Sequence, residues 1–212
     1  MSGEAFRSRI GSALSNRDFG EVEAAWREYA SLHPEDYKYL LGVAGQLARY
    51  DKGALASELC MTLATALLEK DEVDAATEVG KAALKSSQRT EGLRALLQQV
   101  YEAAHGGNSN LATFLEKSGL DGETGSLRAQ VDALERYLAF SEGSYVFHPG
   151  GWGYGEVVDF DPDDEIMTVD FQRKRGHQIK LLNAPKILRR LDPEHIGVYK
   201  WYRRAELDQL MK

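Results

Sequence analysis

The 212-residue sequence predicts an α+β protein in which consecutive helices precede a small β-barrel. Apolar residues recur three or four positions apart up to about residue 140, which is the period of an amphipathic helix. Beyond that point they alternate with polar residues, which is the period of a strand. Four of the five prolines also lie at or after Pro149, so turns punctuate the second part much more than the first.

Residues 1–140 are expected to form a helical domain, either a bundle or a short helical-repeat solenoid. Runs of leucine and alanine at helical spacing are separated by turn-forming segments such as residues 33–36 and 106–108. Residues 74–84 place small side chains where two helices could approach closely, as in a tetratricopeptide repeat (TPR). The helical domain is therefore predicted to be TPR-like.

Several individual positions in the helical part also carry predictions. Thr90 and Ser126 are expected to be N-caps, because a hydroxyl oxygen can accept from the free N–H groups of a first helical turn. The last helix is expected over residues 125–140. Trp26 and Tyr29 could form a binding surface, but aromatic residues on an amphipathic helix belong more often to the core. We therefore predict that both are buried.

The second part predicts four to five short strands. Residues 144–148, 155–160, 165–171 and 177–181 are the expected strands. Residues 161–164 (Asp-Pro-Asp-Asp) and 173–176 (Arg-Lys-Arg-Gly) have the composition of turns, and residues 184–191 are typical of a helical turn that begins near Pro185. So few strands cannot make a sandwich, so residues 141–200 are predicted to curl into an SH3- or Tudor-like barrel. Residues 201–212 are expected to begin a C-terminal helix.

Composition and charge exclude several classes of protein. The net charge of −7 excludes a uniformly basic nucleic-acid-binding protein. No run approaches the roughly 18 consecutive apolar residues that a membrane span needs, and the first residues lack the apolar core of a signal peptide. The single cysteine, Cys60, cannot form an internal disulfide and suits a reducing compartment. We therefore expect a cytoplasmic protein with no membrane partner.

The densest motif is residues 148–155, His-Pro-Gly-Gly-Trp-Gly-Tyr-Gly. Its spaced glycines superficially match a phosphate-binding loop, but a strand follows them instead of a helix N-terminus. We interpret the glycines as the solution to a tight barrel loop, and Trp152 as a candidate contact residue.

Other patterns that could indicate chemistry are weak. Asp159, Asp161 and Asp163 resemble a calcium loop, but Pro162 interrupts them and strands flank them. The histidines are widely spaced, with no cysteine near them to complete a zinc site. The sequence contains no Walker loop, Gly-x-Ser-x-Gly elbow or His-Glu-x-x-His helix. We therefore predict neither an enzyme nor a cofactor, a metal site or a small-molecule substrate.

The charge is distributed unevenly along the chain. Residues 1–141 carry 21 acidic and 15 basic side chains, whereas residues 171–191 carry seven basic side chains and no acidic one. The basic run over residues 173–190 could make one positive face for weak nucleic-acid contact or for an acidic partner. Alternatively, these cations protect a solvated edge strand.

The second part resembles two related groups of proteins. Residues 140–149 (Phe-Ser-Glu-Gly-Ser-Tyr-Val-Phe-His-Pro) and 151–157 (Gly-Trp-Gly-Tyr-Gly-Glu-Val) resemble the opening of CarD-like, Tudor-type domains that interact with RNA polymerase. Residues 169–177 (Val-Asp-Phe-Gln-Arg-Lys-Arg-Gly-His), together with 188–191 and 193–195, resemble the N-terminal extension of long GreA-like transcription elongation factors. In those factors a helical segment precedes the module.

The resemblance covers roughly residues 140–198 and implies a barrel that docks on RNA polymerase, with a role in transcription elongation. Gre factors cleave backtracked transcripts with an acidic-tipped coiled coil, which a C-terminal polymerase-binding domain follows. Neither is recognisable in this sequence, so transcript cleavage does not carry over. The chain is either a short relative or the front of a longer factor.

The leading hypothesis is a non-catalytic, transcription-associated binding protein with a helical scaffold and a polymerase-binding barrel. Its expected partner-binding residues are His148, Trp152, Tyr154, Phe171, Arg173, Lys174, Arg175 and His177. The alternative is a helical-repeat adaptor unrelated to transcription, in which the barrel is a structural cap and Trp152 is buried against the helices. A third hypothesis is a Tudor-like reader, in which Trp152, Tyr154 and another aromatic residue converge as a cage.

Overall fold

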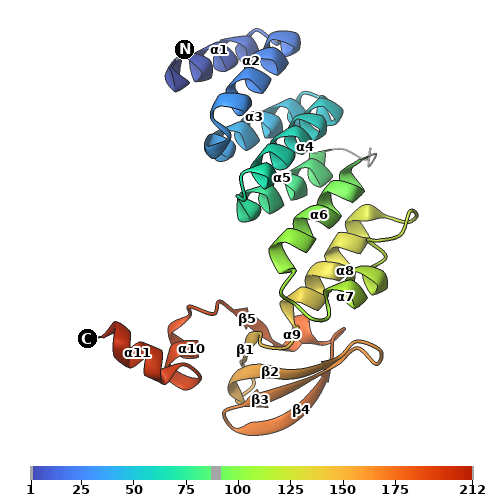
Figure 1. Cartoon of the computed structure of the whole chain (residues 1–212), viewed down its shortest axis with the longest axis vertical. Coiled ribbons are helices and arrows are strands. Elements are labelled where there is room, and N and C mark those ends of the chain that lie inside the picture. Colours follow the sequence, from blue (N-terminus) through green and yellow to red (C-terminus); the bar gives the residue numbers. More distant parts are fainter. Residues whose placement is uncertain (1, 87–91, 212) are drawn as a thin grey trace. The chain divides into compact units, whose positions relative to one another are not determined.

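The computed structural model describes residues 2–86 and 92–211 (Figure 1). The chain forms two compact units, Met1–Ser109 and Asn110–Lys212. The predicted α+β class, with helices first and a small barrel-like sheet after them, is confirmed. Thr90, one of the predicted N-caps, lies outside the described residues.

The first unit is built from helices that pack on their neighbours along the chain. They are α1 (Gly3–Ser15), α2 (Phe19–Leu32), the short 3-10 helix η1 (Pro34–Asp36), α3 (Tyr37–Arg49), α4 (Gly53–Glu69), α5 (Val73–Ser86) and α6 (Leu93–His105). Helices two apart in the chain also touch, since α2 contacts α4, α3 contacts α5 and α4 contacts α6. Contacts restricted to near neighbours along the chain are typical of a stacked helical repeat.

Three of the helix connections share one backbone pattern. Arg17, Asp51 and Asp71 each adopt a positive φ, of 56°, 59° and 62°. In each turn the following residue donates its N–H to a carbonyl oxygen five residues earlier, as Asp18 does to Ala13 over 2.9 Å. This is the hydrogen-bond pattern of a Schellman helix end. The repeat is therefore visible in the turns, although non-glycine residues occupy the left-handed position.

Trp26 and Tyr29 lie in the core of the first unit, as predicted. Their exposed fractions are 0% and 2%. The Trp26 indole Nε1 donates to the Leu40 carbonyl oxygen over 3.1 Å, which connects α2 to α3 and satisfies the buried N–H. Both residues therefore serve packing within this unit.

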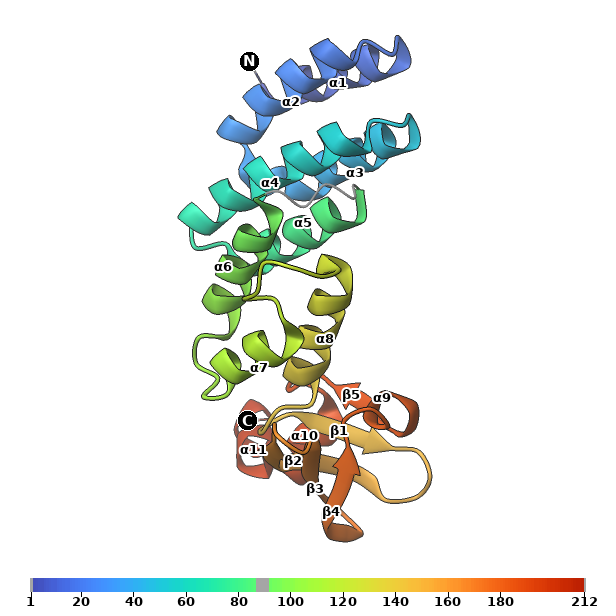
Figure 2. The same cartoon turned by 90° about the vertical axis from the view of Figure 1, so that its right-hand side faces the viewer.

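The second unit begins with two helices and continues as a sheet. Its elements are α7 (Leu111–Ser118), α8 (Leu127–Ala139), β1 (Tyr145–His148), β2 (Gly153–Asp161), β3 (Ile166–Phe171), β4 (Lys174–Lys180), α9 (Ala184–Ile187), β5 (Arg189–Leu191), α10 (Ile196–Trp201) and α11 (Arg204–Leu210). All strand pairs are antiparallel, in the order β4-β3-β2-β1-β5 (Figure 2). Ser126 caps α8 as predicted, because its hydroxyl accepts from the Ala129 N–H.

An aromatic cluster joins α7 and α8 to the sheet. Phe160 on β2 lies edge-on to Phe114 and Tyr137, with ring centroids 5.4 and 6.2 Å apart. The Tyr137 hydroxyl donates to Glu165, and burial together with this carboxylate raises the pKa of Tyr137 to about 12. The change from helix to strand thus lies near residue 140, whereas the compact units divide after Ser109.

Two local predictions about the sheet are wrong. Only Ala184–Ile187 of the expected helical turn over residues 184–191 is helical, because Arg189–Leu191 extends and pairs with the free edge of β1. The expected turn over residues 173–176 is shorter, because β4 already begins at Lys174. Gly176, at φ 61°, instead forms a bulge where its N–H donates to Asp170 Oδ1 over 2.7 Å.

The segment after the sheet forms two short helices. Helix α10 ends at Trp201 and α11 begins at Arg204, so the start of a C-terminal helix expected over residues 201–212 is interrupted near its beginning. The Tyr202 hydroxyl lies 3.0 Å from the carbonyl oxygens of both Tyr154 and Asp170, which attaches this break to β2 and β3. Within the described residues no helix has the length and apolar character needed to cross a membrane.

Candidate functional site

Three of the predicted site residues gather around a fourth, Trp152, at one end of the sheet. The Trp152 ring stacks on His148, with centroids 4.1 Å apart and planes 24° apart. His177 meets it edge-on at 4.2 Å, and Phe171 lies 5.5 Å away. The end of β1, the start of β2, the end of β3 and the first half of β4 meet here because the strands are antiparallel. We call these four side chains the Trp152 cluster.

Basic side chains border this cluster. The Lys174 ammonium lies 4.8 Å from the centroid of the Trp152 ring, within cation–π distance. The Arg173 guanidinium donates to the Gly151 carbonyl oxygen over 3.3 Å, which ties the end of the β3–β4 turn to the glycine loop. Both cations are exposed, whereas Phe171 of the cluster is buried. The result is a braced aromatic surface with positive charge on its edge.

The glycines of the loop serve the fold, as the sequence analysis inferred. Gly151 and Gly153 have φ values of 106° and 80°, a region that other residues rarely adopt. At Gly155 a Cβ atom would lie 2.6 Å from the Phe171 ring, so any side chain there would displace the core beneath the cluster.

Two predicted residues lie apart from the Trp152 cluster. The Tyr154 ring contacts Phe147 and His195, at 5.2 and 6.0 Å, and shares no ring partner with Trp152 within the described chain. Trp152 and Tyr154 therefore do not converge as an aromatic cage. Arg175 lines a different groove, described next.

The second candidate site is a groove lined mainly by residues that the sequence analysis did not select. It has a volume of about 400 Å³ and is lined by Glu156, Val158, Asp170, Phe171, Gln172, Arg175, Trp201 and Tyr202. Trp201 is 53% exposed, a large apolar side chain left in contact with solvent. The sequence signal was the adjacent pair Trp201 and Tyr202. The same pair is also typical of an amphipathic helix, so the sequence alone did not indicate a binding groove.

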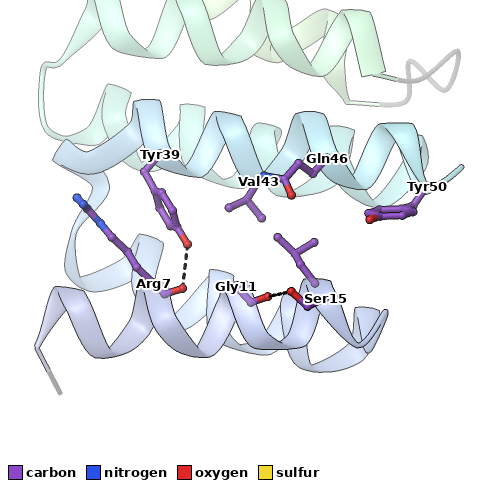
Figure 3. A pocket seen from close by; sticks show the side chains of 8 residues that line it. Arg7, Gly11, Ser15, Tyr39, Val43, Gln46 and Tyr50 are labelled. Carbon is purple, nitrogen blue, oxygen red and sulfur yellow. Dashed lines mark hydrogen bonds between the residues drawn. The ribbon is translucent and has the colours of Figure 1, made fainter.

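A third hollow lies in the helical unit, between α1 and α3. Figure 3 shows its lining, which comes from Arg7, Gly11, Leu14 and Ser15 on one side and from Tyr39, Val43, Gln46 and Tyr50 on the other. Its volume is about 400 Å³. Arg7 is already paired with Asp36 over 2.6 Å, so the groove offers mainly tyrosine, amide and aliphatic surface.

The remaining basic residues lie mainly on the edges of the sheet. Lys180 lies on β4 and Arg189 and Arg190 on β5, the two edge strands. Such positions agree with the protective role of edge cations. No group of three or more His, Cys, Asp or Glu side chains suited to a metal ion occurs within residues 2–86 and 92–211.

His177 should make the stability of the second unit depend on pH. Burial, followed by the charges of Lys174 and His148, lowers the pKa of His177 below its ordinary value of 6.5. Between the two pKa values the unfolded chain binds more protons than the folded one, so stability rises with pH there. We expect the free energy of unfolding to fall as the pH drops through about 6.5, and to level off below the folded-state pKa.

Urea denaturation of the wild type and of His177→Gln at several pH values between about 7.5 and 5.5 measures this effect. Because carboxylates titrate in both proteins, the difference between the two curves isolates the imidazole. Parallel curves for the two proteins would contradict the prediction.

Fold and surfaces together define a protein with stacked helices followed by a barrel-like sheet that carries an aromatic and basic cluster. The chain is 21% identical over 197 residues to a GreA-associated domains protein of Treponema pallidum, covering 93% of this chain and 30% of that protein. It is 26% identical over 195 residues to the transcription elongation factor GreA of Borreliella burgdorferi, covering 92% of this chain and 21% of that protein.

No family model matches the chain, and no solved structure matches it. The chain spans less than a third of the length of either relative. The similarity nevertheless extends over the helical part as well as the sheet, so the chain is distantly related to GreA-type proteins over most of its length.

Proposed function

We propose that the chain is a non-catalytic, cytoplasmic, transcription-associated module whose sheet docks on RNA polymerase through the Trp152 cluster. The observation that carries this proposal is the cluster itself, in which the Lys174 ammonium lies over the Trp152 ring and His148 stacks on the same indole. The named relatives, a GreA-associated protein and a GreA, supply the transcriptional context.

The cluster has the physical character of a protein-binding anchor. Aromatic side chains braced by stacking lose little conformational entropy on binding, which favours affinity. The exposed cations Arg173 and Lys174 supply charge complementarity for an acidic surface and accelerate association. Because seven basic residues are spread over the turn, both edge strands and the short helix α9, we expect nucleic acid to be contacted weakly at most.

The finer fold assignment also belongs to this proposal. A meander of four strands, with β5 returning beside β1 after the short helix α9, supports an SH3- or Tudor-like barrel of the CarD type. The stacked helices then serve as a protein-interaction scaffold, and the groove between α1 and α3 is the surface they offer.

The adaptor alternative makes a different use of Trp152, because it needs the indole to be buried against the helices. The ring contacts of Trp152 come from the sheet and its loops, whereas Phe160 provides the contact with α7 and α8. These contacts favour Trp152 as part of a surface on the sheet.

Capture of purified RNA polymerase from the source organism tests the proposal. The double variant Arg173→Glu, Lys174→Glu should reduce capture at least about tenfold in about 0.1 M salt, because it reverses the charge beside the anchor. The difference should shrink as salt is added. Lys38→Glu with Arg49→Glu, two exposed positions in the helical unit, is the matched control and should leave capture by the sheet unchanged.

Failure of the wild-type protein to retain any polymerase subunit would overturn the proposed function. Equal capture by the wild type and the Arg173/Lys174 variant would overturn the assignment of the cluster as the contact.

A further inference from the structure

The groove beside α10 contains two carboxylates, Glu156 and Asp170, that form no salt bridge within the described residues. Glu156 on β2 and Asp170 on β3 are directly opposite in the strand register. Their neighbours Gly155, Val157 and Val169 are buried, so both acids lie on the other face of the sheet. Like charges placed directly opposite across a strand pair destabilise the pair.

The described part of the chain forms no ion pair with either carboxylate. Asp170 Oδ1 accepts the Gly176 N–H over 2.7 Å, which is a hydrogen bond and not an ion pair. Among the described residues, neither carboxylate takes part in a salt bridge, although Arg175 lines the same groove. Burial and the charge of Asp170 raise the pKa of Glu156, as expected for a partly buried acid beside a second carboxylate.

Two aromatic residues, Trp201 and Tyr202, line the same groove as the two acids. The Tyr202 hydroxyl lies 3.0 Å from the Tyr154 and Asp170 carbonyl oxygens, which holds the end of α10 against the sheet. This attachment places Trp201 at the groove with 53% of its surface exposed. Trp201 and the two carboxylates line the same groove, so cation–π attraction and charge pairing are both available there. The chain's own Lys200 ammonium lies at the outer limit of cation–π distance, 6.0 Å from the Trp201 ring centroid.

We propose that this groove binds an arginine side chain presented by a protein partner. A guanidinium is planar, so it can lie on Trp201 while its N–H groups reach Glu156 and Asp170. A lysine ammonium would satisfy the charge without the planar stacking. The inference is independent of polymerase docking, because the groove shares only the buried Phe171 with the Trp152 cluster.

The test uses the full chain labelled with 5-fluorotryptophan, which reports Trp26, Trp152 and Trp201 as separate fluorine NMR signals. Trp201→Phe assigns the third signal. The probes are the tripeptides Gly-Arg-Gly, Gly-Lys-Gly and Gly-citrulline-Gly, of which the last has nearly the shape of arginine without its charge. We expect Gly-Arg-Gly to shift the Trp201 signal saturably, Gly-Lys-Gly to bind more weakly, and the citrulline peptide to have no effect.

Glu156→Gln should weaken Gly-Arg-Gly at least about tenfold, whereas Asp159→Asn, an exposed acid on the same strand, should not. Arg175→Gln should leave binding equal or stronger. The proposal is overturned if the Trp201 signal does not saturate, or if citrulline matches arginine. It is also overturned if binding appears only in Arg175→Gln, since the chain's own arginine would then be the occupant. Glu156 lies outside the Trp152 cluster, so Glu156→Gln should leave polymerase capture unchanged. Measuring capture separately therefore distinguishes failure of this proposal from failure of the proposed function.

Discussion

Replacing Phe160 with alanine is expected to lower the free energy of unfolding of the second unit by about 3–5 kcal/mol. Phe160 is 5% exposed and lies edge-on to Phe114 and Tyr137, so its ring joins the sheet to α7 and α8. Truncation removes its apolar contacts and leaves a cavity between layers that can collapse only partly. Urea denaturation followed through amide NMR signals of β2 and β3 measures the loss.

Val158→Ala is the matched control for this change. It lies on the same strand but is 40% exposed, so it should change stability by no more than about 0.5 kcal/mol. Similar losses for Phe160→Ala and Val158→Ala would show that the aromatic cluster does not join the helices to the sheet.

Replacing Trp26 with alanine is expected to cost the first unit about 3–5 kcal/mol. The indole is fully buried, and its Nε1 donates to the Leu40 carbonyl oxygen. Trp26→Phe keeps much of the ring volume, so its total cost should be smaller. Loss of the hydrogen bond to Leu40 should account for about 0.5–1.5 kcal/mol of that cost. Urea titrations followed by amide NMR signals of α2 and α3 measure both variants.

Leu32→Ala, on the same helix but 57% exposed, should stay within about 0.5 kcal/mol of the wild type. A Trp26→Ala protein as stable as Leu32→Ala would contradict the placement of Trp26 at the centre of this unit.

Much of the fold could be predicted because its signals are local. Helical spacing identified several of the helices, α3 to α6 and α8 among them, and alternation located the first strands to within about two residues. The errors came where a distant partner decides the conformation. Arg189–Leu191 has no strong strand pattern of its own, but the open edge of β1 offers it backbone hydrogen bonds. Likewise Gly176 was assigned to a turn, because nothing local shows that Asp170 will accept its N–H.

The candidate site shows the same division. The dense motif around Trp152 identified this residue and His148, and the strand register brought Phe171 and His177 to them. Tyr154 is only two residues from Trp152 along the chain, yet its ring packs beside His195 instead. Trp201 was not selected, since its position at a groove depends on Tyr202 reaching a strand 48 residues earlier.

The sequence by itself determined the change from helices to strands near residue 140, the buried status of Trp26 and Tyr29, and the glycine loop that carries Trp152. Periodicity and turn chemistry act within a few residues, so they can be recognised without a partner. Only the tertiary structure decided that α7 and α8 pack with the sheet, and that Glu156 and Asp170 lie opposite each other beside Trp201. Those arrangements depend on strand register and long-range packing, which many residues far apart in the sequence determine together.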